Sequence, residues 1–211
     1  MTTVHARPTA PWRRVTRTWH DAVLVVIGAV VLVLSALPVH QYSVSPAETD
    51  VFRAINDHTV LPFVVVWPIM QLGNFVAVPI AAVIAAVLRR FRLALAMLAA
   101  GIAAYFLAKV VKDIVVRGRP ASLLDDVRLR GASALGRGYV SGHAAVVTLL
   151  AVLVWPYLGK RWRWVAVGVA VFVCLARVYV GAHLPLDVVG GAALGLAIGG
   201  LARLAFGRPV S

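Results

Sequence analysis

The chain has 211 residues, of which 61% are hydrophobic and only 14% are charged, and its mean hydropathy is +0.88. A soluble domain of this size needs more polar residues on its surface, so the composition excludes that class and predicts an all-α protein that spans a membrane. The formal charge of +13 falls mostly in short clusters between apolar runs, without the basic and aromatic stripe of a nucleic-acid groove, so no nucleic-acid partner is expected.

The first apolar run covers residues 22–39 and follows the basic segment 1–21. A cleavable signal peptide has an apolar core of about 7 to 15 residues, so this longer run predicts an uncleaved first span. In the polar stretch 40–59 that follows, apolar residues recur at helical spacing beside Glu48 and Asp50. This pattern favours an amphipathic helix at the membrane interface, and an ordinary solvated face is the alternative for its acidic residues.

Five further apolar runs are long enough to span a bilayer, which takes about 20 residues, and they cover 61–88, 93–112, 142–158, 163–180 and 185–205. The first of these five contains three prolines and the pair Gly73-Asn74, which predict a break in the helix near that pair. With the run at 22–39, the chain is expected to have six transmembrane helices packed as a core helical bundle.

The basic residues indicate the orientation of the spans. One side of the membrane holds Arg7, Arg13, Arg14, Arg17, Arg89, Arg90, Arg92, Lys160, Arg161, Arg163, Arg203 and Arg208. Because cytoplasmic loops are enriched in Lys and Arg, this side is predicted to be cytoplasmic. The expected organisation is a basic cytoplasmic segment (1–21), a six-span membrane domain (22–205) with its motif-bearing core at 93–205, and a short cytoplasmic tail (206–211).

Three polar segments lie at the predicted outer ends of the spans, and the first reads Lys112-Asp-Ile-Val-Val-Arg-Gly-Arg119-Pro120. If the helix continues, Lys112 and Arg119 lie nearly two turns apart and point the same way. If Gly118 ends the helix, the following loop carries Arg119. A basic cluster after a span is also a common anchor that extends to the interface, so this segment alone does not indicate a binding site.

The second segment is Ser141-Gly142-His143, which immediately precedes an apolar run. Ser141 is a favourable N-cap, and the free N–H groups and positive dipole of a helix start suit an anion. His143 would lie in the first turn, where an imidazole can donate a proton to a leaving oxygen. A simple serine cap with an incidental histidine is the alternative.

The third segment contains Arg177, His183 and Asp187 and connects the last two predicted spans. Ionisable residues this close to hydrocarbon are costly, which favours a functional role. Pro185 suits the first turn of a helix, and Asp187 follows His183 by four residues. A carboxylate in this position can bind one imidazole nitrogen and leave the other free to attack. An Arg-Asp pair that only bridges two spans is the alternative.

Together, K-x6-R-P, S-G-H and R-x5-H-x3-D resemble the signature motifs of the type 2 phosphatidic acid phosphatase family, in the superfamily that also contains bacterial acid phosphatases and vanadium haloperoxidases. The resemblance covers about residues 61–205. It implies that His183 is the nucleophile that forms a phosphohistidine, that Asp187 orients it, and that His143 is the general acid for the leaving group.

The resemblance also implies that Lys112, Arg119 and Arg177 hold the phosphate oxygens, with help from Ser141 and the backbone N–H of Gly142. Fixed cations and N–H dipoles are the stabilisers that phosphoryl transfer requires. No metal or cofactor is implied, and no Cys or His cluster has the spacing of a metal site.

The function that the resemblance implies is that of a lipid phosphatase in the plasma or inner membrane, with its site on the extracytoplasmic side. Candidate substrates are polyprenyl diphosphate, phosphatidic acid and phosphatidylglycerol phosphate. A lipid phosphotransferase that uses the same phosphohistidine is an alternative, as is a non-catalytic protein that binds lipid phosphates. The oligomeric state has no signal in the sequence.

Two positions depart from the family pattern, since Val140 and Ala176 replace the usual Pro and Ser. Neither missing residue carries the implied chemistry. The loop between the first two motifs also contains Arg128, Arg130 and Arg137. These arginines are expected either to belong to a solvated loop or to contact a second phosphate or a head group.

Overall fold

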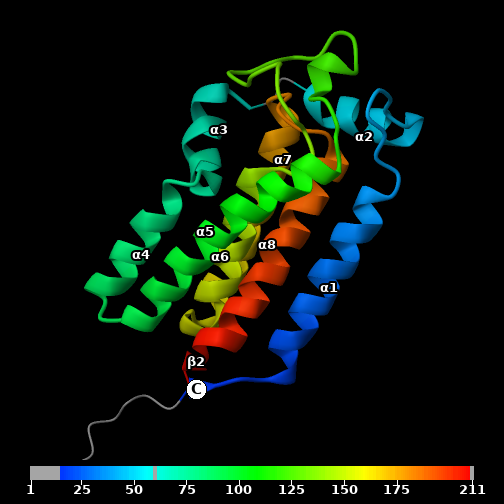
Figure 1. The fold of residues 1–211 in the computed structure, drawn as a ribbon. Helices are drawn as coiled ribbons and strands as arrows, with labels where there is room; N and C mark the ends of the chain where they lie inside the picture. The colour runs from blue at the N-terminus through cyan, green and yellow to red at the C-terminus, as the bar shows by residue number, and fades with distance from the viewer. Residues whose placement is uncertain (1–14, 59–60, 210–211) are drawn as a thin grey trace, which may run out of the picture.

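The computed structural model describes residues 15–58 and 61–209, and nearly all of its regular structure is α-helical (Figure 1). The α-helices are, in chain order, α1 (Trp19–Ala36), α2 (Pro46–Asn56), α3 (Phe63–Met70), α4 (Ala77–Val87), α5 (Phe91–Ile114), α6 (Gly142–Val154), α7 (Lys160–Tyr179) and α8 (Pro185–Phe206). The 3-10 helices are η1 (Gln71–Gly73), η2 (Pro120–Ser122) and η3 (Trp155–Tyr157). Strands β1 (Val15–Thr16) and β2 (Arg208–Pro209) form one short antiparallel pair. Apart from this pair, the all-α prediction is confirmed for the residues that the structure describes.

Four helices, α1, α5, α7 and α8, are each long and apolar enough to cross a bilayer. A fifth candidate is the pair formed by Phe63–Gly73 and α4, which is bent by 67° and is either a broken span or a re-entrant loop. The break lies where the sequence predicts it, and the side chain of Asn74 accepts the N–H of Val76 at 3.1 Å, just before α4 begins. Helix α6 with η3 is apolar but shorter. The described residues thus contain four or five candidate spans, and a sixth stays a prediction.

The outer surface of the helices is apolar. Large hydrophobic side chains such as Val33, Val83 and Phe106 are about 60% exposed, with values of 59%, 61% and 60%. A soluble monomer rarely exposes apolar surface on this scale, whereas hydrocarbon is a suitable environment for it. The chain is therefore a multi-pass membrane protein.

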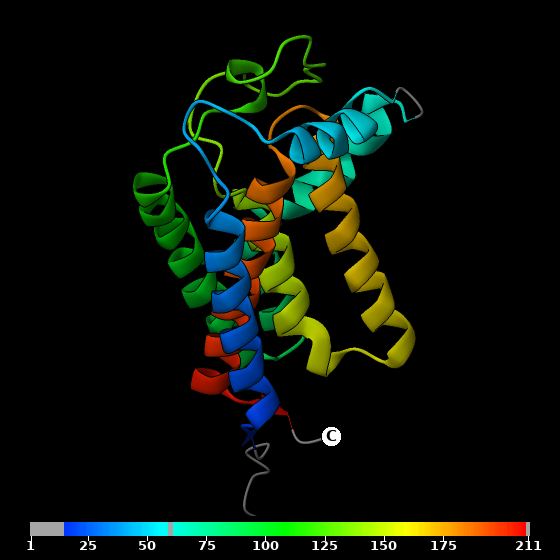
Figure 2. The same ribbon diagram turned by 90° about the vertical axis from the view of Figure 1, so that its right-hand side faces the viewer.

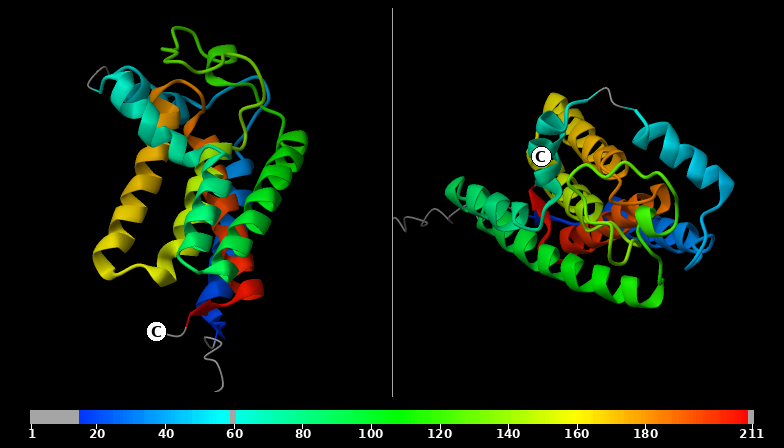
Figure 3. Two further views of the ribbon diagram at one scale, coloured as in Figure 1. Left: turned by 90° about the vertical axis from the view of Figure 1, so that its left-hand side faces the viewer. Right: turned by 90° about the horizontal axis from the view of Figure 1, so that it is seen from above.

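Helix α8 lies at the centre of the bundle, where it packs against α1, α6 and α5 (Figures 1 and 3). Glycines on α8 permit this close approach. A Cβ atom at Gly191 would overlap the carbonyl oxygen of Ser141, and one at Gly195 would overlap the carbonyl oxygen of Ala145. The first turn of α6, which carries Gly142 and His143 of the second motif, therefore lies directly against the N-terminal half of α8, which carries Asp187 of the third.

We expect Gly195→Ala to destabilise the protein, because its methyl group would push the backbone of α6 away from α8. Overpacking of this kind typically costs about 1 to 3 kcal/mol. The matched control is Gly168→Ala on α7, where a Cβ atom meets nothing within 4 Å. Thermal unfolding in detergent should show a lower midpoint for Gly195→Ala only. Equal midpoints for the two variants would contradict the close packing of α6 on α8.

The basic segments gather at one end of the bundle, as the sequence predicts. Arg92 donates to the carbonyl of Phe206 at 2.6 Å, and Arg17 Nε donates to the carbonyl of Leu204 at 2.7 Å. The guanidinium of Arg90 lies 4.7 Å from the centre of the ring of Tyr157. The α4–α5 turn, the end of η3 and the two ends of the described chain therefore share one end. Arg7, Arg13 and Arg14 lie outside the described residues.

The opposite end carries α2 and the long connection between α5 and α6 (Figures 1 and 2). Helix α2 confirms the helix predicted in the 40–59 stretch, and Ser45 caps it by accepting the N–H of Glu48 at 3.3 Å. Its acidic residues do not share one environment, because Asp50 is exposed whereas Glu48 is 6% exposed. A solvated face is therefore the wrong interpretation for Glu48.

Candidate active site

The three motifs meet at the end of the bundle that carries α2. The N–H of Ser141 donates to the carbonyl of Asp187 at 2.8 Å, which joins the second motif to the third. The first motif is joined to the residues just before the second, since the N–H of Gly138 donates to the carbonyl of Arg117 at 2.8 Å. Lys112 Nζ, near the end of α5, donates to the carbonyl of Gly138 at 3.2 Å. All eight predicted site residues are therefore brought to one place.

Helix α5 ends at Ile114, so Lys112 lies in its last turn and Arg119 lies in the loop. Of the two alternatives for the first motif, the second is thus observed, with the helix ending even before Gly118. Arg119 donates from one terminal nitrogen to the carbonyl of Ser133 at 3.1 Å. Its Nε is buried and has no hydrogen-bond partner in the described structure.

The second motif forms the start of α6. Ser141 is fully buried and is the N-cap, and its hydroxyl accepts the N–H of Ala144 at 3.5 Å. His143 is the second residue of the helix and is partly exposed. A Cβ atom at Gly142 would meet nothing within 4 Å, so the helix start borders open space rather than packed protein. Free N–H groups at such a position favour an anion.

The third motif forms the connection between α7 and α8. His183 is 4% exposed and Asp187 is fully buried, and His183 Nδ1 lies 3.5 Å from Asp187 Oδ2. This distance is long for a good hydrogen bond, and catalytic contacts of this kind often shorten when substrate binds. Burial lowers the pKa of His183 to about 4, although the Asp187 carboxylate opposes the shift. The imidazole is therefore neutral at pH 7, the form in which it can act as a nucleophile.

Several cations face one another in this site. Lys112 interacts electrostatically with Arg119 and Arg177, and His143 interacts with both arginines and with His183. Arg177 is 9% exposed, its terminal nitrogen contacts Met70 Sδ at 3.2 Å, and its Nε is buried without a hydrogen-bond partner in the described structure. Unpaired buried donors are rare and point to an absent partner. An anion between these cations would satisfy the donors and offset the repulsion.

The loop arginines make structural contacts. Arg128 donates to the carbonyl of Asp57 at 2.7 Å, and Arg130 donates to the carbonyl of Asn56 at 3.0 Å and lies 4.2 Å from the centre of the Tyr179 ring. Arg137 forms an exposed ion pair with Asp113. These contacts fasten the loop to α2, α5 and α7, which favours a structural role over binding of a second phosphate.

The two departures from the family pattern lie in apolar surroundings. Val140 is fully buried in the core cluster around α5 and α8, and Ala176 is 4% exposed in a cluster with Val66 and Met70. Both side chains pack in the core beside the motifs rather than among the cations.

Two residues that contact the site are not identified by the sequence analysis. Arg117 is 1% exposed and forms ion pairs with both Glu48 and Asp187. Arg117 is one of the unspecified positions of the first motif, K-x6-R-P, and the sequence places Glu48 on an amphipathic helix or a solvated face. The position of Arg117 directly after Val115 and Val116 is its one signal in the sequence, and no spacing relates Glu48 to the motifs.

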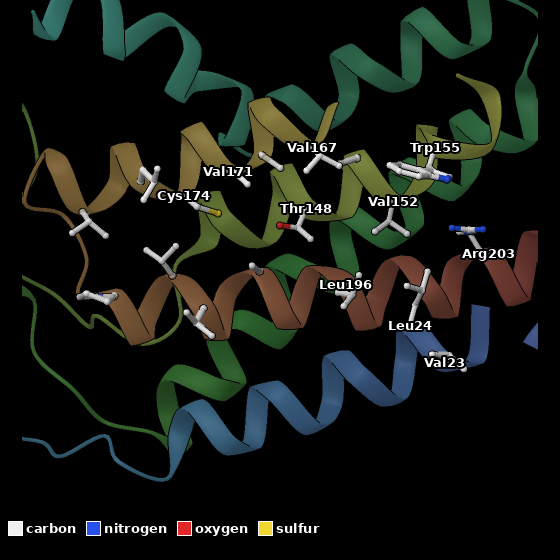
Figure 4. Close-up of a pocket in the computed structure, with 18 of the residues that line it drawn as sticks. Val23, Leu24, Thr148, Val152, Trp155, Val167, Val171, Cys174, Leu196 and Arg203 are labelled. Carbon is white, nitrogen blue, oxygen red and sulfur yellow. The ribbon is translucent and has the colours of Figure 1, made fainter. Parts of the chain in front are cut away.

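An apolar groove of about 920 Å³ lies between α1, α6, α7 and α8 (Figure 4). Aliphatic side chains such as Val171 and Leu196 line it, and Trp155 and Arg203 lie toward the end of the bundle that carries the chain termini. None of the eight predicted site residues lines this groove. It is therefore not the place of the chemistry, but it has the size and lining for a hydrocarbon chain.

Comparisons with known proteins agree with the geometry. The chain is 31% identical over 124 residues to an undecaprenyl-diphosphatase from Sulfolobus acidocaldarius, and the match spans 58% of this chain but only 59% of the relative's length. The fold is similar to the crystal structure of LpxE from Aquifex aeolicus, with a TM-score of 0.69, 24% identity, and coverage of 77% of this chain and 98% of that one.

It is also similar to the crystal structure of a PAP2-type phosphatidylglycerolphosphate phosphatase from Bacillus subtilis. The TM-score is 0.61 at 22% identity, and the match covers 88% of this chain and 95% of that one. These two likenesses show the fold. A family model described as the PAP2 superfamily matches residues 89–210, which are more than half of the chain and contain all three motifs. The chain therefore belongs to the PAP2 superfamily.

Proposed function

We propose that the chain is a lipid phosphatase that removes the terminal phosphate of a lipid phosphate or diphosphate through a phosphohistidine at His183. One observation carries the proposal: a buried imidazole, that of His183, lies between the Asp187 carboxylate and the cations Arg119 and Arg177, whose buried Nε atoms have no partner in the described structure. A nucleophile, an orienting group and an anion cradle in one place are the parts that covalent phosphoryl transfer needs.

The first step joins His183 to phosphorus. Lys112, Arg119 and Arg177, with Ser141 and the N–H of Gly142, hold the phosphate oxygens and stabilise the charge that develops on them. Nε2 of His183 attacks phosphorus, while its Nδ1–H donates to the Asp187 carboxylate. The bond between phosphorus and the leaving oxygen breaks.

His143 completes the chemistry. Burial and the charge of Arg177 lower the pKa of His143 to about 3 in the free site. A bound anion raises this pKa, and the protonated His143 then gives its proton to the leaving oxygen. In the second step neutral His143 takes a proton from water, and this water attacks the phosphohistidine. Inorganic phosphate leaves and His183 is free again. This sequence balances protons, because His143 is protonated at the start and at the end.

The substrate is proposed to be a polyprenyl diphosphate, phosphatidic acid or phosphatidylglycerol phosphate. Membership of the superfamily and the names of the relatives support this range. The apolar groove beside α8 supports a hydrocarbon chain on the substrate. The orientation proposed from the basic residues places the six-span domain (22–205) in the plasma or inner membrane, with 1–21 and 206–211 in the cytoplasm and the site on the outer side.

The test is a phosphate-release assay over these three lipids, with purified wild-type protein beside the His183→Ala variant. Release from at least one lipid by the wild type, and loss of that release in the variant, is the expected result. An added acceptor alcohol separates hydrolysis from phosphotransfer, since a transferase would make a phosphorylated acceptor. Tight lipid binding without any release would refute the proposal and indicate a binding protein.

The proposed mechanism uses no metal ion, since its positive charges come from Lys112, Arg119 and Arg177. In residues 15–58 and 61–209, no group of three or more His, Cys, Asp or Glu side chains is placed to hold one. We expect EDTA to leave the rate of phosphate release unchanged at fixed ionic strength. A large loss of rate that Mg²⁺ or Zn²⁺ restores would contradict the mechanism.

A further inference from the structure

Glu48 is the buried acidic residue of helix α2. It is 6% exposed, whereas Asp50 on the same helix is exposed. A carboxylate is almost never buried unless it is paired, because removal from water is costly. The contacts of Glu48 therefore explain its position.

The partner of Glu48 is Arg117, and the contact uses both carboxylate oxygens. Arg117 donates from one terminal nitrogen to Glu48 Oε1 at 3.0 Å and from the other to Oε2 at 2.5 Å. Such two-point contacts fix the plane of a guanidinium group. Glu48 Oε1 also accepts the N–H of Leu186 at 3.0 Å, which attaches α2 to the first turn of α8.

Arg117 also contacts Asp187, one of the proposed catalytic residues, through the nitrogen that binds Glu48 Oε1. This nitrogen also donates to Asp187 Oδ1 at 3.3 Å. The other oxygen, Oδ2, accepts the N–H of Leu184 at 2.9 Å and lies 3.5 Å from His183 Nδ1. Both oxygens of Asp187 are therefore held, and Arg117 holds the one that faces away from His183.

Arg117 is unlike the phosphate-binding cations of the site. It is 1% exposed and has two carboxylate partners, whereas neither Arg119 nor Arg177 forms an ion pair with a carboxylate in the described structure. Its positive charge contacts the Asp187 oxygen that faces away from His183, so the Asp187 carboxylate separates Arg117 from His183. Without Glu48, the whole charge of Arg117 would act on Asp187 and weaken its support of the positive imidazole that forms during attack.

We propose that Glu48 and Arg117 are positioning residues for phosphoryl transfer: Glu48 orients Arg117, and Arg117 orients the Asp187 carboxylate against His183. This role rests on the proposed function of His183 as nucleophile. It makes α2, which lies outside the three motifs, part of the catalytic apparatus, because a buried contact on this helix sets the geometry of a group on α8.

The test uses Glu48→Gln, which keeps the shape of the side chain, and Asp50→Asn as the matched control on the same helix. We expect Glu48→Gln to lower kcat by about 10- to 100-fold, the range typical when a metal ligand loses the outer partner that orients it, since Glu48 would orient Arg117 and Asp187 in the same way. KM for the lipid and the inhibition constant of inorganic phosphate should not change, because the cations that hold phosphate are intact. Asp50→Asn should keep the wild-type kcat.

A double variant separates positioning from a general loss of structure. In the Asp187→Asn background, Glu48→Gln should lower kcat no further, because Glu48 acts through Asp187. A full further loss in that background would overturn the inference, and so would an unchanged kcat in Glu48→Gln alone. Arg117→Lys keeps the positive charge but not the two-point contact, and it should resemble Glu48→Gln.

A spectroscopic readout is independent of turnover. The ¹⁵N shifts of the His183 imidazole should show one tautomer, protonated on Nδ1, in the wild type and in Asp50→Asn, and a mixture in Glu48→Gln. The same tautomer in all three proteins would overturn the positioning role. A wild type without phosphate release would instead refute the proposed function, so the two failures are distinguishable.

Discussion

His183→Ala should reduce the rate of phosphate release by at least about 10⁴-fold, because removal of a nucleophile abolishes the covalent route rather than weakening it. The substitution leaves Lys112, Arg119 and Arg177 in place. Phosphate and lipid phosphate should therefore still bind, and the loss should appear in kcat. Steady-state release of phosphate checks the loss of rate, and calorimetric titration of the His183→Ala protein with inorganic phosphate checks that binding remains.

The matched control is His58→Ala. His58 lies at the same end of the bundle, its side chain is exposed, and its carbonyl oxygen, which accepts from Arg130, remains after the substitution. This variant should keep the wild-type rate. Comparable rates in wild type and His183→Ala would contradict the assignment of the nucleophile, whatever the effect on His58.

Asp187→Asn should give the second largest effect, a loss of about 10²- to 10⁴-fold in kcat, or about 3 to 5 kcal/mol of transition-state stabilisation. The amide is similar in shape, but it has no charge to stabilise the positive imidazole and can select the wrong tautomer of His183. Since Asp187 does not bind phosphate in the proposed mechanism, KM and the affinity for phosphate should be nearly unchanged.

Asp113→Asn is the control for charge in the same region. Asp113 is exposed and pairs with Arg137 at the surface, where ion pairs contribute little. Its variant should behave as wild type. A loss of phosphate affinity in Asp187→Asn as large as the loss in kcat would show that Asp187 acts in binding, and the orienting role would then be wrong.

Much of the fold was predictable because a helix that crosses a bilayer needs a minimum length and an apolar sequence. The apolar runs at 22–39 and 93–112 match α1 and α5 closely, although α5 begins and ends slightly outside its run. The break at Gly73-Asn74 was predictable because proline and glycine disrupt a helix locally. Helix α6 is shorter than its predicted span, since Pro156 lies in the 3-10 turn η3.

The site was predictable as far as its residues lie in three short segments. Each segment contains polar residues beside hydrocarbon, where they are costly, and the order Lys112, His143, His183 places one segment at the end of each of three helices. The structure brings these segments together through backbone contacts such as the 2.8 Å bond from Ser141 to Asp187. The chemical role of each residue stays a prediction.

The contact between Glu48 and Arg117 was not predictable in the same way. These residues are 69 positions apart, and no periodic pattern relates a surface helix to a loop that far along the chain. Their side chains meet because α2 folds back over the start of α8, where Glu48 also accepts the N–H of Leu186. Burial, which separates Glu48 from its neighbour Asp50, is a property of the folded chain only.

The most direct test is to trap the phosphorylated protein. Wild-type protein mixed with a ³²P-labelled lipid phosphate and quenched in alkali within milliseconds should carry label that is stable to base and labile to acid, on the peptide that contains His183. The His183→Ala protein should carry none. Label on another residue, or turnover by the His183→Ala protein at the wild-type rate, would contradict attack by this imidazole.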